Sequence, residues 1–170
     1  MSEPLRPGDR EAVARQLGRP PRAMRAVAHR CRCGLPDVVE TSPRLEDGTP
    51  FPTLYYLTCP RAASAIGRLE SDGLMRRMTE RLRQEPELAA RYVAAAQDYL
   101  RRRDALGVLG RAPAQGGMPD RVKCLHALYG HHLATGDNPI GAWVAERNEP
   151  MPCPAPCAGP HRDDPTAVPS

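Results

Sequence analysis

The stretch Thr53-Leu54-Tyr55-Tyr56-Leu57-Thr58-Cys59-Pro60 decides how the chain is organised. Its first six residues combine aromatic and β-branched side chains, which favour a β-strand. Pro60 suits the first turn of a helix, because the amide hydrogen that proline lacks would have no helical partner there. The sequence therefore predicts a change from strand to helix at Cys59, with a sheet before this point and helices after it.

Two further strands are predicted on the N-terminal side, at about 24–29 and 38–41. Turn residues separate them from each other and from the strand at 53–58, so the three strands are expected to form an antiparallel meander. Residues 9–18 have helical spacing and are predicted to form a short helix before the first strand.

On the C-terminal side, apolar residues recur at helical spacing after Pro60. Two helices are predicted before Pro86, and three more at 86 to about 105, 121–134 and 140–147. The predicted fold class is α+β, with a three-stranded antiparallel sheet packed on four to five helices. We expect residues 1–18 to form a basic N-terminal arm with a short helix, residues 19–148 a single domain, and residues 149–170 a disordered Pro-rich tail.

Composition narrows the class of protein. The chain carries 24 Lys and Arg against 20 Asp and Glu, a net charge of +4, and only 4% aromatic residues. We see no apolar stretch of the roughly 18–20 residues that span a bilayer, no secretory signal and no nucleic-acid motif. A cytoplasmic location is therefore expected, with cysteines that are reduced thiols or ligands.

The cysteines and histidines suggest a metal site. Cys31 and Cys33 follow the first strand, Cys59 ends the third, and Cys124 lies near the start of the helix at 121–134. In an antiparallel meander the C-terminal ends of the first and third strands lie at the same end of the sheet, so these thiols are expected to approach one another. A Cys₃His zinc site or an iron–sulfur cluster would fit them, with His29, His126 or His131 as further candidates.

Helix geometry argues against a simple version of this site. On a helix over 121–134, Cys124 and His126 differ by about 200° and face opposite sides, while His131 lies roughly 10 Å from Cys124 along the axis. Cys124 and His126 converge only if the helix begins after Cys124. His132 falls in the apolar stripe and is predicted to be a core residue.

A reactive thiolate is the second interpretation. Cys59 directly precedes a proline-initiated helix, whose dipole and free amides favour a thiolate that could act as a nucleophile or redox sensor. The alternative is that Cys59 is a small buried residue. Cys153 and Cys157 fall in the predicted tail and are left out of the site.

A third set of candidates is basic. If the N-terminal arm packs against the helix at 121–134, Arg19, Arg22, Arg121 and Lys123 could form an anion site near the helix N-terminus. A non-catalytic interaction domain therefore remains the alternative function, with structural cysteines and a basic arm that meets an acidic protein or anionic ligand.

Several strings of the sequence together resemble a known family. They are Gly18-Arg19-Pro20-Pro21-Arg22, Ala28 to Gly34, Phe51-Pro52-Thr53 with Tyr56 to Pro60, Arg121 to His126, and His131 to Pro139. Their content and order resemble a bacterial family, common in actinobacteria, that is known as domain of unknown function 501. The resemblance covers roughly residues 17–145. It implies no activity, cofactor or catalytic residue.

Overall fold

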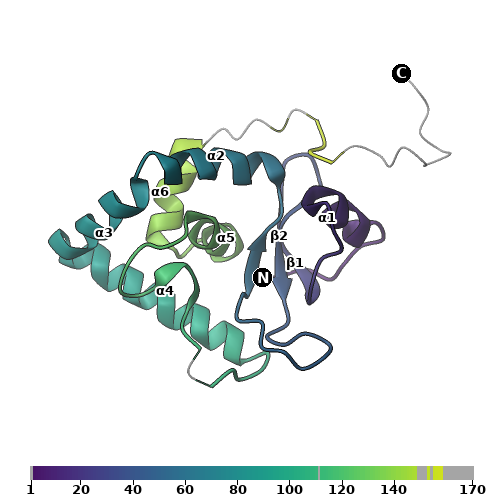
Figure 1. Cartoon of the computed structure of the whole chain (residues 1–170), viewed down its shortest axis with the longest axis horizontal. Helices are drawn as coiled ribbons and strands as arrows, with labels where there is room; N and C mark the ends of the chain where they lie inside the picture. Colours follow the sequence, from purple (N-terminus) through teal and green to yellow (C-terminus); the bar gives the residue numbers. More distant parts are fainter. Residues whose placement is uncertain (1, 111, 149–152, 154, 159–170) are drawn as a thin grey trace.

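The structure of the chain, a computed structural model, describes residues 2–110, 112–148, 153 and 155–158 (Figure 1). It confirms the α+β class and a three-stranded antiparallel sheet in the order β1-β2-β3. The elements in chain order are α1 (Asp9–Leu17), β1 (Met24–Arg30), β2 (Pro36–Thr41), β3 (Tyr55–Leu57), α2 (Pro60–Ser71), α3 (Leu74–Gln84), α4 (Pro86–Asp104), the 3-10 helix η1 (Gln115–Gly117), α5 (Leu125–Thr135) and α6 (Pro139–Asn148).

The sheet lies between two layers of helix. Helix α1 covers one face, and the remaining helices gather on the other side (Figure 1). Neighbouring residues of β2 point to opposite faces, as the pleat of a strand requires. Val39 packs with Val13 of α1 in the smaller apolar cluster, and Val38 joins the larger cluster with the helices that follow β3.

The predicted change from strand to helix is confirmed at Cys59. This residue is extended, with φ −64° and ψ 116°, and is the N-cap of α2, while Pro60 occupies the first helical turn. The Ala63 amide closes the first helical bond to the Cys59 carbonyl at 2.9 Å. The Thr58 amide still bonds the Asp37 carbonyl at 2.8 Å, so the ladder continues up to the point where the helix begins.

Helix α5 packs between the sheet and α6, and a glycine permits the approach of α6. A Cβ atom on Gly141 of α6 would lie 2.2 Å from the Leu128 carbonyl oxygen of α5. Since no real side chain tolerates that distance to backbone, α6 can approach α5 only with glycine here.

The predicted helix at 121–134 begins four residues later than expected, at Leu125. The backbone amides just before Leu125 form hydrogen bonds outside the helix. The amides of Arg121 and Lys123 bond the carbonyls of Gly117 and Gly116 at 3.0 and 2.7 Å, and the Val122 amide donates to Thr79 Oγ1 of α3 at 3.0 Å. These bonds hold residues 121–123 in a non-helical conformation and leave Cys124, which is extended, as the N-cap of α5.

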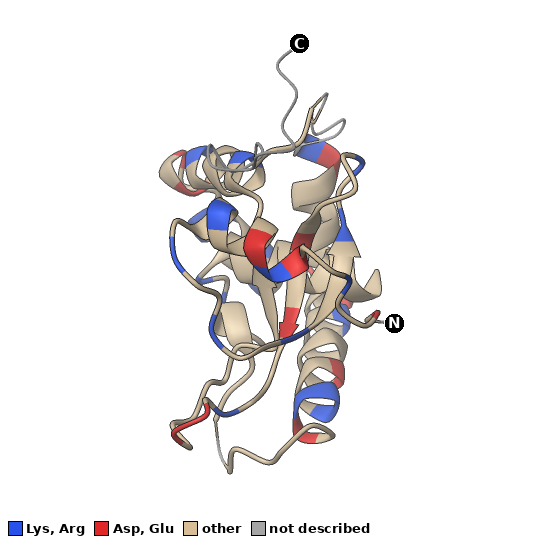
Figure 2. Ribbon diagram, turned by 90° about the vertical axis from the view of Figure 1, so that its right-hand side faces the viewer, with Lys and Arg blue, Asp and Glu red and all other residues tan. Residues whose placement is uncertain are grey.

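Residues 2–18, predicted as a basic arm, are packed on the sheet. Glu3 forms a bridge with Val27 of β1 through two backbone hydrogen bonds of 2.8 and 3.0 Å. Basic and acidic residues are interspersed over this side of the molecule (Figure 2). The predicted disordered tail at 149–170 lies outside the described residues, except for Cys153 and residues 155–158. Within the described residues, no helix is long and apolar enough to cross a membrane.

Tyr99 of α4 anchors the segment that leads into β3. Its ring is fully buried and its hydroxyl accepts a hydrogen bond from the Leu54 amide at 2.6 Å, while it donates to the Pro52 carbonyl at 3.1 Å. The Leu54 carbonyl is bonded by the Thr41 amide of β2 at 2.9 Å, and the Tyr99 hydroxyl satisfies the Leu54 amide on the other side and the Pro52 carbonyl.

We expect Tyr99→Phe to lower the free energy of unfolding by about 1–3 kcal/mol, because it leaves the buried Leu54 amide without its acceptor. Tyr56→Phe is the matched control, since the Tyr56 ring is half-buried and its hydroxyl contacts an exposed Arg19 at 3.4 Å. Urea unfolding of both variants measures the difference. Equal losses in the two variants would contradict this role for Tyr99.

Candidate functional site

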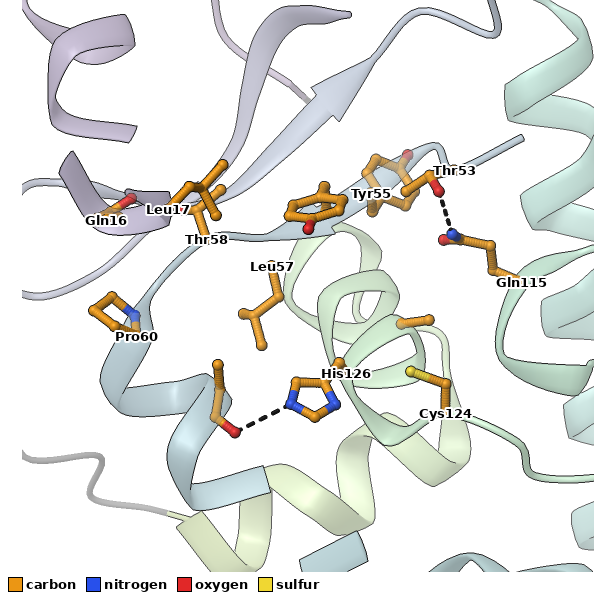
Figure 3. Close-up of a pocket in the computed structure, with 13 residues that line it drawn as sticks. Gln16, Leu17, Thr53, Tyr55, Leu57, Thr58, Pro60, Gln115, Cys124 and His126 are labelled. Atoms are coloured by element: carbon orange, nitrogen blue, oxygen red, sulfur yellow. Dashed lines mark hydrogen bonds between the residues drawn. The ribbon is translucent and has the colours of Figure 1, made fainter. Parts of the chain in front are cut away.

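A pocket of about 560 Å³ opens between α1, the end of the sheet, α2 and the start of α5 (Figure 3). Most of its wall is apolar. The polar exceptions are the thiol of Cys124, the ring of His126 and several amides and hydroxyls. The lining residues are Gln16, Leu17, Thr53, Tyr55, Tyr56, Leu57, Thr58, Pro60, Ala63, Gln115, Cys124, His126 and Ala127.

Cys124, His126 and Glu70 form a group at this wall. The sulfur, a ring nitrogen and a carboxylate oxygen lie within 4.8 Å of one another. Glu70 Oε1 accepts the Leu125 amide at 2.7 Å and lies 3.2 Å from His126 Nδ1. His126 Nε2 lies 3.1 Å from the Ala63 carbonyl, and the other ring nitrogen is on the side of Cys124 (Figure 3).

The electrostatics of Cys124 and His126 favour the charged form of each residue. The interaction with Cys124 raises the pKa of His126 to about 9; burial opposes this, and the Glu70 carboxylate adds to the increase. Burial alone would raise the pKa of the Cys124 thiol, but the hydrogen bond from His126 and the Ala127 amide lower it below its ordinary value. The two residues therefore stabilise each other in their charged forms, a proton on His126 favouring loss of the proton from Cys124.

The structure meets the condition under which Cys124 and His126 were expected to converge, since α5 begins after Cys124. The boundary itself differs from the predicted helix at 121–134, and Glu70 is a site residue that the sequence does not single out. Its signal is its position on α2: residues 63 and 70 are two helical turns apart and share a face, so the carbonyl of Ala63 and the carboxylate of Glu70 reach the same imidazole.

The other predicted thiols form a separate group. Cys31, Cys33 and Cys153 have their sulfur atoms within 4.8 Å of one another. Cys157 lies near them, and its sulfur accepts from Gln16 Nε2 at 3.2 Å. The predicted meeting of Cys31, Cys33, Cys59 and Cys124 is wrong, since Cys124 lies in the other group. Cys153, predicted to lie outside the site, joins Cys31 and Cys33, and Cys157 lies beside them.

Cys59, the candidate nucleophile, is 2% exposed. Its thiol interacts with that of Cys157 and is not among the groups that line the pocket. The helix N-terminus predicted to activate it is present, but burial keeps a substrate away from the sulfur.

His131 lies in the core, apart from both thiol groups. It is fully buried, its ring stacks on Tyr55 with centroids 5.8 Å apart, and it meets Tyr99 edge-on at 5.4 Å. Burial lowers the pKa of His131 to about 4. His132, predicted to be a core residue, is half-buried instead. Helix α5 buries both the face toward the sheet and the face toward α6, so a single apolar stripe did not separate these two histidines.

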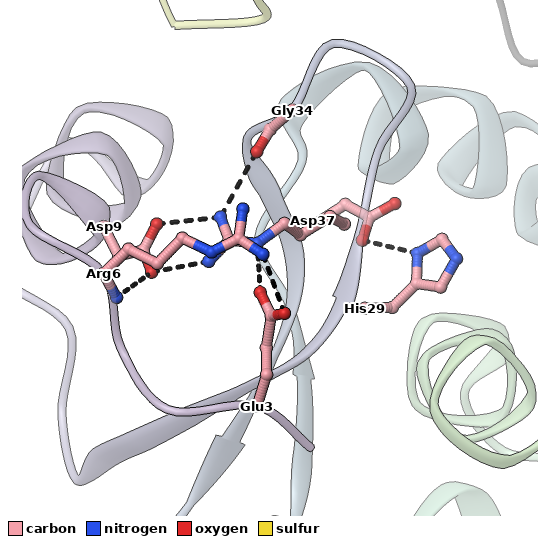
Figure 4. Close-up of polar contacts among 7 residues, drawn as sticks. Glu3, Arg6, Asp9, His29, Gly34 and Asp37 are labelled. Atoms are coloured by element: carbon pink, nitrogen blue, oxygen red, sulfur yellow. Dashed lines mark hydrogen bonds and ion pairs between the residues drawn. The ribbon is translucent and has the colours of Figure 1, made fainter. Parts of the chain in front are cut away.

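His29 pairs with a carboxylate and not with the thiols (Figure 4). Its Nδ1 lies 2.8 Å from Asp37 Oδ1, and this hydrogen bond raises the pKa of His29. On the neighbouring residue, the Arg30 guanidinium donates to Asp9 at 2.7 Å and to Glu3. These ion pairs fasten the N-terminal segment to β1.

The four basic residues predicted to bind an anion are all exposed. Arg19 and Arg22 line a small pocket with Tyr56, whereas Arg121 and Lys123 lie beside Gly117 in the segment before α5. Since α5 begins at Leu125, neither of the latter belongs to its first turn. An anion site built from all four stays a prediction.

The sequence matches the family described as "Protein of unknown function (DUF501)" over residues 27–146. The chain belongs to this family. The DUF501 region contains Glu70, Cys124 and His126 together with Cys31 and Cys33, and it ends before Cys153. No curated protein and no solved structure shows significant similarity to the chain.

The buried His131 is expected to make the protein sensitive to mild acid. Its folded pKa of about 4 lies below the ordinary value of 6.5, so the unfolded chain binds the proton more readily. Stability is therefore lost as pH falls from about 6.5 to 4, and we expect a loss of about 1–2 kcal/mol between pH 7 and pH 5.

His131→Phe keeps an aromatic ring between the two tyrosines and removes the titration. Its free energy of unfolding, measured in urea at both pH values, should change less than that of the unsubstituted protein. His29→Gln is the control: the raised pKa of His29 adds stability as pH falls from 7 to about 6.5 and a constant amount below it, so this variant should lose at least as much stability as the unsubstituted protein. The same loss in His131→Phe as in the unsubstituted protein would exclude His131 as the source.

Proposed function

We propose that this DUF501 protein uses Cys124 as a nucleophile that accepts an acyl group from a small molecule bound in the pocket. One observation carries the proposal: the Cys124 sulfur lies at the pocket wall beside an imidazole whose two nitrogens both face oxygen acceptors. A thiolate is the reactive form of cysteine, and an adjacent imidazolium is a common way to stabilise it.

The hydrogen bonds support a doubly protonated His126. The Ala63 carbonyl can only accept, so Nε2 carries a proton. Glu70 Oε1 already accepts from the Leu125 amide, and it faces Nδ1 as a second acceptor. With a proton on each nitrogen the ring is a cation, and the nearby sulfur balances its charge as a thiolate.

The pocket suggests what kind of molecule it holds. Leu17, Leu57 and Pro60 offer apolar surface. Gln16 Oε1 and Gln115 Oε1 are buried and accept no hydrogen bond from the described residues, although both side chains line the pocket. A buried acceptor without a partner costs free energy that a ligand with N–H or O–H groups recovers. The substrate class that fits is an acyl compound with an apolar body and such donors.

The reaction proceeds in two balanced halves. The Cys124 thiolate attacks the carbonyl carbon, a thioester bond forms, and the leaving group departs with the proton of His126 Nδ1. His126 is then neutral and removes a proton from water or another acceptor, which attacks the thioester. The acyl group leaves on the acceptor, and Cys124 and His126 return to thiolate and imidazolium.

A divalent metal at the same group is the second candidate function. The 3.2 Å between His126 Nδ1 and Glu70 Oε1 is close to the roughly 3.3 Å that separates two ligands of a tetrahedral zinc ion. The bond from Nε2 to the Ala63 carbonyl is also the kind that orients a metal-binding histidine. A purely structural role for the cysteines, as in an interaction domain, leaves this grouping unexplained.

Alkylation rates test the thiolate. Trypsin places Cys124 alone in the peptide 124–147 and Cys59 alone in 45–61, so mass spectrometry follows both thiols in one sample. With iodoacetamide at neutral pH in the presence of a chelator, we expect Cys124 to react much faster than Cys59. His126→Gln should slow Cys124 by up to about tenfold for each unit by which the pKa of its thiol rises above the assay pH, while His29→Gln should not.

A Cys124 rate that is equal in the unsubstituted protein and in His126→Gln would contradict the ion pair. A fast rate that appears only after the chelator is added, together with a bound metal, would favour the metal instead.

An activated acyl donor such as p-nitrophenyl butyrate tests the acyl transfer. We expect one equivalent of nitrophenol in a burst and a butyryl group on peptide 124–147. Cys124→Ser should abolish both, and Gln115→Leu, which removes an unpaired acceptor from the pocket wall, should leave the burst with this donor-free ester intact. Absence of the adduct from the reactive, folded protein would exclude the proposed activity.

A further inference from the structure

We propose that Cys31, Cys33, Cys153 and Cys157 bind one zinc ion, which fastens the C-terminal segment to the connection between β1 and β2. This site is separate from the pocket thiol and combines two residues of the DUF501 region with two that lie beyond it. Its ligands are the type that structural zinc prefers, four cysteine sulfurs.

The β1–β2 connection presents two of the ligands. The Cys31 amide bonds the Leu35 carbonyl at 3.0 Å and the Gly34 amide bonds the Cys31 carbonyl at 2.9 Å, so residues 31–34 form a tight turn. Gly34 has φ +83°, which glycine adopts without strain. The turn brings the sulfur atoms of Cys31 and Cys33 to the same side, although only one residue separates them.

The third ligand comes from the other end of the chain. Cys153 lies with its sulfur within 4.8 Å of both turn cysteines. In a tetrahedral site with zinc–sulfur bonds of about 2.3 Å, the sulfur atoms are about 3.8 Å apart. The three sulfurs therefore need to move by about 1 Å or less to hold one ion, a change within the reach of side-chain rotation.

The fourth ligand is the nearest remaining thiol of the same segment. The Cys157 amide interacts with the Cys33 sulfur, which places this residue beside the trio. Its own sulfur faces Gln16 and Cys59. A rotation of the Cys157 side chain toward Cys33 completes a four-sulfur site.

The surroundings suit a site of this charge. Zinc with four thiolates carries a net charge of −2, and Arg61 Nη1 lies 3.5 Å from the Cys153 sulfur. The same nitrogen donates to the Ala155 carbonyl at 3.1 Å. Arg61 thus offsets part of this charge and holds Cys153 and Ala155 in place, as partners outside a metal's ligand set commonly do.

The site has a consequence for the pocket. The described C-terminal residues, Cys153 and 155–158, lie beside the β1–β2 connection (Figure 1). Gln16 of α1 bonds Cys157 and also lines the pocket. A zinc ion that fastens this segment would therefore stabilise one wall of the pocket, without contributing a ligand to the Cys124 group.

Cobalt binding to the full-length protein tests the site, because Co²⁺ replaces zinc and reports its ligands by absorption. After anaerobic purification and chelation, we expect one equivalent of Co²⁺ to give strong thiolate charge-transfer and tetrahedral bands that zinc removes. Cys33→Ser and Cys153→Ser should each weaken zinc binding by more than about 100-fold, beyond the effect typical of losing a supporting partner. Cys157→Ser should weaken binding and alter the cobalt spectrum.

Cys124→Ser is the control that separates this site from the proposed catalytic thiol, and it should bind cobalt normally. Protection in the unsubstituted protein gives a readout independent of any variant's folding: zinc should slow alkylation of peptides 33–44 and 148–162, but not of 124–147. The proposal would be overturned by cobalt bands that persist in Cys153→Ser or that are lost in Cys124→Ser. It would also be overturned by a protein that holds these thiols as disulfides and binds no metal after their reduction.

Discussion

The carboxylate of Glu70 joins α2 to the start of α5, and the geometry of the pocket depends on this contact. It accepts the Leu125 amide at 2.7 Å and faces the His126 ring at 3.2 Å. The first amides of a helix lack partners within the helix, so an acceptor on a neighbouring element both stabilises the helix and sets its position. Here the same carboxylate also faces the imidazole that lies beside Cys124. Packing, helix capping and site chemistry therefore meet in one side chain.

The sheet separates two layers of helix that are held in different ways. On one face α1 is held by a small apolar cluster and by the ion pairs of Arg30 with Asp9 and Glu3. On the other face the helices that follow β3 build the larger core. The pocket and the thiol group of the β1–β2 connection both lie where these layers meet the beginning of α2. Gln16 touches both, so the N-terminal helix belongs to the site and is not an appendage.

Local signals predicted most of the fold. Aromatic and β-branched residues before Cys59 and the proline after it act within a few residues, and the change from strand to helix lies where they indicated. The start of α5 could not be predicted this way. The amides of residues 121–123 are taken up by η1 and by Thr79, more than forty residues away in the case of Val122. No pattern within 121–134 reveals that competition, and a helix drawn through it separates Cys124 from His126.

The candidate site residues show the same contrast between local signals and contacts of distant segments. Residue type alone selected the cysteines and histidines, because few other side chains provide thiolates, imidazoles or soft metal ligands. Which of them meet depended on contacts between distant segments: Glu70 with the start of α5, and Cys153 with the turn at Cys31. His131 shows the converse, since its burial between Tyr55 and Tyr99 turns a candidate ligand into a neutral core residue. Sequence determined the elements and the chemistry available, because propensity and side-chain identity are local. Tertiary packing determined the partners, because distances, burial and pKa values arise only when separate elements come into contact.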